Sequence, residues 1–366
     1  MISKRSAYRG CLLGLAVGDA MGYTVDSKCW AHIQEDYGPN GLLGYDLVNG
    51  YADGTSHTQL CAFTCNGLLL GLTRGQLQGT MAPFIKYIAL SQREWAIGQR
   101  RYNQPRQNYC WVFRVNELRR RHCTDTRMVD TLNRPMKCSL EDPVNRFDGP
   151  ASLASAAAVG MFAQRERMDQ HEIDRLGAEA VALTYGSPIA FITGAVLASV
   201  VNRVLHDQQM PLKDLFLQAM EGVDEEFGYE YPQTAEVLHI LRHAITLSED
   251  EKLNQRETME HLVCENAAQA LAGAFYAILT CQDDFDSAMI TAVNHSGRSS
   301  AVACITGAVL GARMGEEALP EFYMECLETA EVLRVLADDL VDGCPMEQGN
   351  RMFDLDWDRK YLHGEP

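Results

Sequence analysis

The stretch NHSGRSSAVACITGAVLGARMG, residues 294–315, joins a small polar turn to a segment built almost entirely of Ala, Val, Gly and Ile. This composition predicts a helix whose small side chains favour a very close approach by another part of the molecule. Ser296 or Ser299 could cap the start of this helix with a side-chain oxygen. Arg298 adds a permanent positive charge at the same point. The stretch therefore predicts a closely packed helix with a fixed charge at its N-terminus.

The rest of the 366-residue chain shows helical rather than strand periodicity. The predicted helices cover residues 5–22, 57–73, 81–98, 151–164, 171–184, 188–205, 211–222, 231–248, 258–280, 284–293, 299–314 and 319–340. Residues 99–150 are rich in Arg, Asn and Asp, which predicts a long irregular, insertion-like region. The fold class that follows is all-α, with a single compact multi-helix domain over residues 1–342 and a surface extension over residues 343–366.

The composition favours some classes of protein over others. A formal net charge of −17 argues against non-specific binding to nucleic acid or to anionic membranes, and it suits a basic protein partner. No stretch approaches the roughly 20 apolar residues that a membrane-spanning helix needs. The 12 cysteines form no CxxC pair and lie mostly among apolar residues, which indicates reduced thiols and a cytoplasmic protein.

Three segments place glycines and small polar residues before predicted helix starts, at residues 9–27, 53–71 and 294–315. Helix N-termini present free N–H groups and the positive end of the helix dipole, so they suit phosphate-bearing ligands. Capped helices in close packing would produce the same pattern without any ligand. Asp19 and Asp26 are candidates for a catalytic carboxylate, although a lone carboxylate more often caps a helix or forms an ion pair.

These segments resemble blocks of the ADP-ribosylglycohydrolase family, in the family's order and spacing. GCLLGLAVGDAMGYTVD at 10–26 is similar to its opening motif, and GTSHTQL at 54–60 falls where the family carries Thr-Asp-Asp-Thr-Gln. LTYGSPIAFITGAVLASV at 183–200 resembles its Leu-Thr-His-Gly-His-Pro helix start, and residues 292–320 resemble its Asn-His-Ser-Gly-Asp-Ser-Asp-Ser helix. The resemblance implies an all-α domain with a binuclear magnesium site, at which ADP-ribose is cleaved from its acceptor.

The chain departs from the family at the residues that would hold magnesium. The positions that correspond to the family's metal ligands carry Thr55, Ser56, His57, Arg298, Ser300 and Ala301. Two hydroxyls, an imidazole and a guanidinium thereby replace family aspartates. Mg²⁺ prefers carboxylate oxygens, whereas an arginine cannot ligate a metal and stays charged. We therefore expect no magnesium cofactor.

A ligand cleft beside these positions is also implied by the resemblance. The further residues expected to contact a ligand there are Gly149, Tyr185, Ser296 and Gly297. Tyr185 stands where the family carries a histidine, so this part of the cleft has changed as well. ADP-ribose is the ligand that the resemblance implies, and the charge of Arg298 could pair with its phosphates.

Three kinds of function are compatible with these observations. The first is a degenerate ADP-ribosylglycohydrolase that acts by binding, either to ADP-ribose or to a protein. Members with the Asn-His-Ser-Gly motif resemble bacterial immunity proteins, so the protein partner could be an ADP-ribosyltransferase toxin that is blocked. The second is an active ADP-ribosyl hydrolase with an altered site, which would use Asp19, Asp26, Asp53 or His57. The third is structural recruitment of the fold, similar to the lens crystallins of this family.

Overall fold

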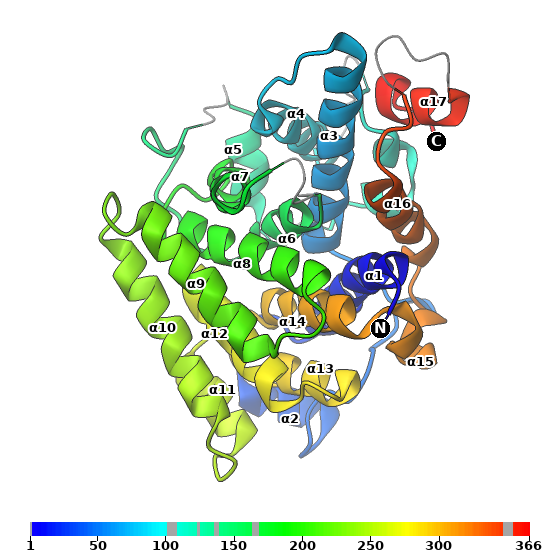
Figure 1. Ribbon diagram of the computed structural model, residues 1–366. Coiled ribbons are helices and arrows are strands. Elements are labelled where there is room, and N and C mark those ends of the chain that lie inside the picture. The colour runs from blue at the N-terminus through cyan, green and yellow to red at the C-terminus, as the bar shows by residue number, and fades with distance from the viewer. Residues whose placement is uncertain (1, 101–107, 123–124, 135–138, 163–167, 347–353) are drawn as a thin grey trace.

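The chain folds as an assembly of helices. The computed structural model describes residues 2–100, 108–122, 125–134, 139–162, 168–346 and 354–366. Within these ranges it contains 17 α-helices and three short 3-10 helices. The only β-pairing in the same ranges consists of two isolated bridges, Val48–Tyr51 and Ala52–Leu327. The predicted all-α fold class is confirmed (Figure 1).

The helices follow one another closely along the chain. In chain order they are α1 (Lys4–Tyr23), α2 (Trp30–Tyr37), α3 (Ser56–Gln78), α4 (Phe84–Gly98), η1 (Trp111–Arg114), η2 (Glu117–Arg119), α5 (Thr126–Leu132), α6 (Leu153–Phe162), α7 (Gln170–Ala182), α8 (Pro188–His206), α9 (Leu212–Phe227), α10 (Gln233–Ser248), α11 (Gln255–Leu262), α12 (Ala267–Thr280), α13 (Phe285–Val293), α14 (Ser299–Met314), η3 (Glu316–Ala318), α15 (Glu321–Met324), α16 (Ala330–Asp342) and α17 (Leu355–His363). Short connections join most of them, which is typical of neighbouring helices in one domain.

The small-residue helix α14 packs along α1, from the other end of the chain (Figure 1). Glycines that recur once per turn of α1 meet small residues of α14 in the reverse order, so the two helices are antiparallel. The facing pairs are Gly10 with Gly311, Gly14 with Gly307, Gly18 with Ala303, and Gly22 with Ser299. A Cβ atom on Gly14 would lie only 2.1 Å from the carbonyl oxygen of Gly307. The two backbones are therefore in direct contact, and this close approach explains the loss of side-chain bulk.

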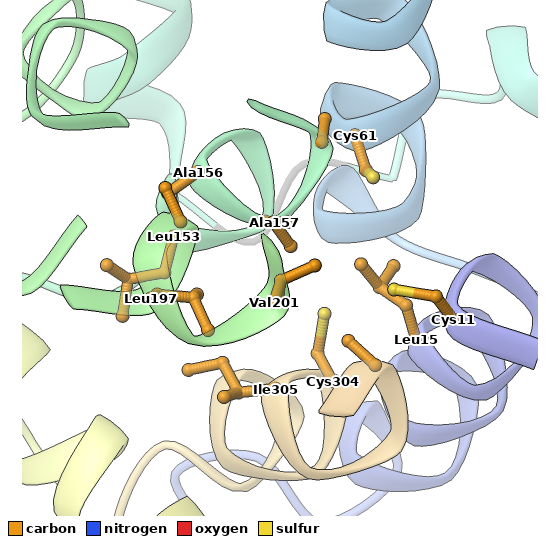
Figure 2. Packing of buried hydrophobic residues seen from close by; sticks show 14 of the residues in the cluster. Cys11, Leu15, Cys61, Leu153, Ala156, Ala157, Leu197, Val201, Cys304 and Ile305 are labelled. Carbon is orange, nitrogen blue, oxygen red and sulfur yellow. The ribbon is translucent and has the colours of Figure 1, made fainter. Parts of the chain in front are cut away.

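Around this pair, α3, α6 and α8 complete a continuous apolar core. Figure 2 shows side chains from these helices pointing toward one another, among them Cys61 of α3, Ala157 of α6, Val201 of α8 and Cys304 of α14. All four are fully buried or nearly so. Since cysteine and alanine take little room, the helices of this core can lie close together.

Helix α8 is more apolar than the sequence analysis allowed. By length and composition alone Pro188–His206 could cross a membrane, so the expectation that no stretch approaches such a span was too strict. Within the fold, however, 83% of the apolar window is buried against other parts of the protein. This burial is typical of the central helix of a globular domain.

Two long predicted helices are each divided in the structure. The predicted helix 258–280 is interrupted where Val263 and Cys264 adopt left-handed backbone conformations, with φ of 66° and 56°. The second part, α12, begins with a capping box between Asn266 and Gln269. Similarly, the predicted helix 319–340 consists of α15 and α16. Apolar periodicity continues across such breaks, so it could not locate them.

Other differences concern short elements. Helix α2 was not predicted, because Ile33 is its only buried residue and the apolar pattern is correspondingly weak. The described parts of residues 99–150 contain η1, η2 and α5, so this region is less irregular than expected. Near the C-terminus, α17 lies against α3, where the buried Trp357 indole donates a hydrogen bond to Thr73 Oγ1 at 2.9 Å.

Candidate functional site

Asp19 holds the start of α3 in place from a fully buried position on α1. Its carboxylate accepts hydrogen bonds from the N–H groups of Thr55 and Thr58, at 2.7 and 3.0 Å, and from both threonine hydroxyls at 2.6 Å. Thr55 is the N-cap residue, with its Oγ1 accepting from the His57 N–H at 3.4 Å. Asp19 therefore satisfies N–H groups that have no partner within the helix. This arrangement agrees with helix capping, the alternative to a catalytic role for Asp19.

Asp26 does the same for α14. Its Oδ1 accepts hydrogen bonds from the Ser300 N–H at 3.1 Å and from the Ser300 hydroxyl at 2.8 Å. Its Oδ2 forms an ion pair with the Arg298 guanidinium, with an N–O distance of 3.3 Å. The helix is therefore capped by a residue far away in sequence, and the expectation that Ser296 or Ser299 caps it was wrong, because Arg298 is the N-cap residue and provides no side-chain cap.

His57 lies between the two helix starts and is buried. Its Nε2 is 3.3 Å from the Ser300 hydroxyl, which joins the α3 and α14 motifs. Burial lowers the pKa of His57, and the nearby Arg298 charge lowers it further, although Asp19 and Asp26 act in the opposite direction. A neutral imidazole is thus favoured next to the guanidinium.

The turn before α14 is held rigidly by its own side chains. His295 Nδ1 accepts a hydrogen bond from the Gly297 N–H at 3.0 Å, so Nε2 carries the proton and donates to the Ala292 carbonyl at 3.0 Å. Both the N–H and the hydroxyl of Ser296 donate to Glu260, each at 3.0 Å. A Cβ on Gly297 would lie 2.4 Å from a backbone oxygen, so only glycine fits there. Ser296 and Gly297 therefore shape the turn.

A cavity of about 290 Å³ opens beside this turn. It is lined by Asp125, Arg127, Asp148, Gly149, Pro150, Ala151, Tyr185, Glu265, Asn266, Gln269 and Arg298. The Arg298 side chain is 22% exposed, but its Nε is buried without a hydrogen-bond partner among the described residues. A buried donor without a partner is costly, so this atom is well placed to bind a ligand acceptor.

One wall of the cavity is a hydrogen-bonded group around Asp125. Tyr185 is buried and its hydroxyl donates to Asp125, while the Arg127 Nε donates to the same carboxylate at 2.9 Å. Burial would raise the pKa of Asp125, but the hydrogen bonds from Arg127 and Tyr185 outweigh it and hold the pKa below its usual value. Burial and the adjacent carboxylate raise the pKa of Tyr185, so its hydroxyl remains a donor.

The structure thus brings together some of the residues singled out in the sequence and separates others. Gly149, Tyr185 and Arg298 line the cavity, whereas Ser296 and Gly297 are absent from its lining. Ser56 and Ala301 are buried at the helix starts, where the Ser56 N–H donates to the His122 carbonyl at 2.9 Å.

Six polar or charged residues of the cavity lining were missed by the sequence analysis. They are Asp125, Arg127, Asp148, Glu265, Asn266 and Gln269. Three of the six lie in the region 99–150, which offered no periodic signal. The capping box at 266–269 could have located the start of α12, but not its position beside the cavity.

Asp53, a further candidate carboxylate, is engaged elsewhere. It lies 3.3 Å from His122 Nδ1 and 3.3 Å from an Arg120 nitrogen. The hydrogen bond to Asp53 raises the pKa of His122, against the effect of its burial. The ring of Tyr23 packs edge-on against His122, with 4.2 Å between centroids. This group ties the end of α1 to the loops before α3 and after η2, and it compensates the charge of Asp53.

The residues at the family's metal position do not fit a binuclear magnesium site. Asp19 is saturated by four hydrogen bonds, and Asp26 is bound to Ser300 and Arg298. The guanidinium lies where a cation would be repelled. Among the described residues there is no group of three or more His, Cys, Asp or Glu side chains that could hold a metal ion.

Comparisons with known proteins point to one protein family. A sequence profile of the ADP-ribosylglycohydrolase family matches residues 2–350. A solved structure described as an ADP-ribosylglycohydrolase-related protein complex is similar to the chain with a TM-score of 0.59 and 21% identity. That similarity covers 93% of this chain and 98% of the other, and at this identity it shows the fold alone. No curated protein matches the sequence. The match over nearly the whole chain shows that this protein belongs to the ADP-ribosylglycohydrolase family.

Proposed function

We propose that this family member binds ADP-ribose, either free or attached to a protein, without the metal-dependent hydrolysis of its family. The observation that carries the proposal is Arg298. It pairs with Asp26 at the family's metal position, while its unpartnered Nε is beside a cavity large enough for part of a nucleotide. A fixed guanidinium can hold a phosphate in place of metal ions, because it forms two parallel charge-assisted hydrogen bonds.

The remaining lining of the cavity suits the rest of such a ligand. Asp148 and Glu265 provide carboxylate acceptors, and Asn266 and Gln269 provide amides. Ribose hydroxyls and the adenine amino group are donors that pair with the two carboxylates. A ligand with both phosphates and hydroxyls therefore matches the cavity better than a simple anion does.

An active hydrolase with an altered site is the less favoured alternative. Cleavage of a glycosidic bond usually needs an acid and a base or nucleophile on either side of the bond. Asp19 and Asp26 both cap helices, and Asp53 is paired with His122. The described residues thus offer no carboxylate pair free for this role at the family's metal position.

Calorimetric titration with ADP-ribose tests the proposal. We expect saturable binding without added magnesium, and about tenfold weaker binding for Arg298→Gln, because one charge-assisted phosphate contact is lost. Arg313→Gln, on the same helix but outside the cavity lining, is the matched control and should bind like the unaltered protein. Equal binding by Arg298→Gln would contradict the assigned role of the guanidinium.

A turnover assay separates binding from catalysis. The protein is incubated with an ADP-ribosylated substrate and magnesium, and released ADP-ribose and bound metal are both measured. We expect neither release above background nor stoichiometric metal. Turnover comparable to that of a family member with all its aspartates would overturn the proposal and favour the active hydrolase.

Blocking of an ADP-ribosyltransferase toxin is a second candidate, favoured by the surface. Tyr229 is fully exposed on the turn between α9 and α10, next to the acidic residues Glu225, Glu226 and Glu230. With the net charge of −17, this acidic and aromatic turn suits a basic protein partner. A pull-down with proteins encoded nearby in the genome, repeated with Tyr229→Ala, tests this role. If neither ADP-ribose nor a protein binds, structural recruitment of the fold becomes the better explanation.

A further inference from the structure

We call the cavity beside Arg298 the cleft. A second and larger cavity lies at the opposite end of α11 from this cleft. The cleft is lined by Glu265 and Asn266, just beyond the end of α11, whereas this cavity is lined by Asn254 and Arg256 at its start. Its volume is about 480 Å³, within the usual range for small-molecule sites. We call it the α11 pocket, and its lining residues are Trp30, Gln34, Pro39, Asn40, Asn254, Gln255, Arg256, Ile290, Thr291 and Asn294.

Among the residues that the structure describes, Arg256 is the only charged one that lines the α11 pocket, and it is held in position. Its guanidinium stacks over the Trp30 ring at 5.0 Å from the centroid. Trp30 is anchored in turn, since its backbone N–H donates to the Ser296 hydroxyl at 2.9 Å and its ring packs against Gly41. Glu257 lies 3.6 Å from Arg256, but this carboxylate is 70% exposed, so the pair is weak. The pocket therefore offers a fixed positive charge in a strongly acidic protein.

The rest of the lining is rich in amides and hydroxyls. Asn294 is fixed by hydrogen bonds to the Leu42 backbone, and Gln255 accepts a hydrogen bond from Thr291 at 3.2 Å. Gln34 and Asn40 are exposed, and their side chains have no hydrogen-bond partner among the described residues. Each free amide can both donate to and accept from a ligand hydroxyl.

The balance of these groups points to one class of ligand. Within the described part of the chain, no carboxylate lines the pocket, and its only aliphatic side chains come from Pro39 and Ile290. An apolar ligand would leave the amides unpaired, and a cation would face the guanidinium. We propose that the α11 pocket binds a small hydroxylated anion, namely a sugar or polyol that carries a phosphate or a carboxylate. This site is separate from the cleft and does not depend on the function proposed for it.

Titration with four probes tests the proposal: glucose 6-phosphate, glucuronate, glucose and inorganic phosphate. We expect glucose 6-phosphate, glucuronate or both to bind, with glucose and inorganic phosphate about tenfold weaker, because each lacks one of the two recognised features. The two charged probes show whether the anionic group is a phosphate or a carboxylate. Arg256→Gln should weaken binding about tenfold, and Asn40→Ala, on an exposed loop, should weaken it several-fold. Arg242→Gln on the surface of α10 is the matched control and should change nothing.

A cleft variant distinguishes the two sites. Arg298→Gln should leave binding of these probes intact while it weakens binding of ADP-ribose. Loss of probe binding in Arg298→Gln but not in Arg256→Gln would overturn the α11 pocket and assign the probes to the cleft. If glucose binds as tightly as the better of the two charged sugars, the role of charge is overturned. If inorganic phosphate binds as tightly as that sugar, the role of the hydroxyls is overturned. Absence of binding by all four probes at millimolar concentration would overturn the site altogether.

Discussion

Arg298 forms a backbone hydrogen bond and an ion pair, and it also lines the cleft. Its backbone N–H donates to the Cys264 carbonyl at 2.9 Å, its guanidinium pairs with Asp26, and its Nε is beside the cavity. A permanent charge at this point compensates Asp26, which would otherwise be partly buried without a cation. At the scale of single residues, the arginine therefore stabilises the start of α14 and is also a candidate ligand contact.

Restoration of the family's aspartates tests whether the scaffold still has the geometry of a metal site. The variant carries Ser56→Asp, His57→Asp, Arg298→Asp and Ser300→Asp. We expect magnesium to raise its Tm, because the arginine no longer neutralises Asp26 and carboxylate ligands are available. The measurement is a thermal scan with and without magnesium.

The matched control replaces the same four positions with asparagine, which has the shape of aspartate without its charge. It should show no magnesium-dependent shift in Tm. If the aspartate variant behaves like this control, the helix starts no longer hold the family's spacing, and the pocket of the variant has collapsed.

His295 makes the stability of the turn depend on pH. Burial lowers the pKa of His295 to about 4, against an unfolded value of 6.5. The unfolded chain therefore binds this proton first as the pH falls. The contribution of the neutral imidazole is complete above pH 6.5 and is lost as the pH falls toward 4, by at most about 1.4 kcal/mol per pH unit. Urea unfolding at pH 7 and pH 5 measures this loss.

The same measurement on His295→Gln isolates the contribution of His295 to the pH dependence of the free energy of unfolding. Glu94 and Asp174 act in the opposite direction, because burial raises the pKa of these carboxyls to about 6 and about 7. They are unchanged in the variant, so only the difference between the two slopes reports on His295. A variant whose free energy of unfolding falls as steeply as that of the unaltered protein would refute this assignment.

At the scale of helices, the antiparallel contact of α1 and α14 determines where the site is formed. Their glycines allow the backbones to touch, and this brings Asp19 and Asp26, at or just after the end of α1, to the starts of α3 and α14. Each carboxylate accepts N–H groups that the helix itself cannot satisfy. The two helix starts are thus held by side chains from a third helix and the loop that follows it.

Gly14→Ala should strongly destabilise the protein. The added methyl group would lie 2.1 Å from the Gly307 carbonyl oxygen, and a helix backbone cannot move aside as a flexible side chain can. We expect a loss of about 1–3 kcal/mol or more in the free energy of unfolding, measured by chemical denaturation. Gly44→Ala is the control, because nothing lies within 4 Å of its added Cβ. Equal stability of the two variants would mean that α1 and α14 are not in backbone contact.

At the scale of the whole molecule, charge is the dominant property. The net charge of −17 is spread over a compact fold, and repulsion among like charges opposes compaction. Local ion pairs such as Arg9 with Asp338, at 2.7 Å, relieve only part of it. An acidic surface of this kind also accelerates encounter with basic partners at low salt.

Added salt should therefore stabilise the protein. Raising sodium chloride from about 10 mM to about 150 mM shortens the Debye length from roughly 30 Å to roughly 8 Å and screens the long-range repulsion. We expect a higher urea midpoint at the higher salt concentration, with the same slope. Potassium chloride should act equally, because the effect is screening. A lower midpoint would mean that attractive ion pairs outweigh the repulsion.

The sequence by itself determined the helical class and the family. Periodicity is local and the motif blocks retain their order along the chain, so both are visible without coordinates. Only the tertiary structure decided that Asp19 and Asp26 cap helices, that Arg298 pairs with Asp26, and which residues line the cleft. The physical reason is distance along the chain: Asp26 and Ser300 are 274 positions apart, and their contact depends on the packing of α1 against α14. Such a contact leaves no local pattern in either segment.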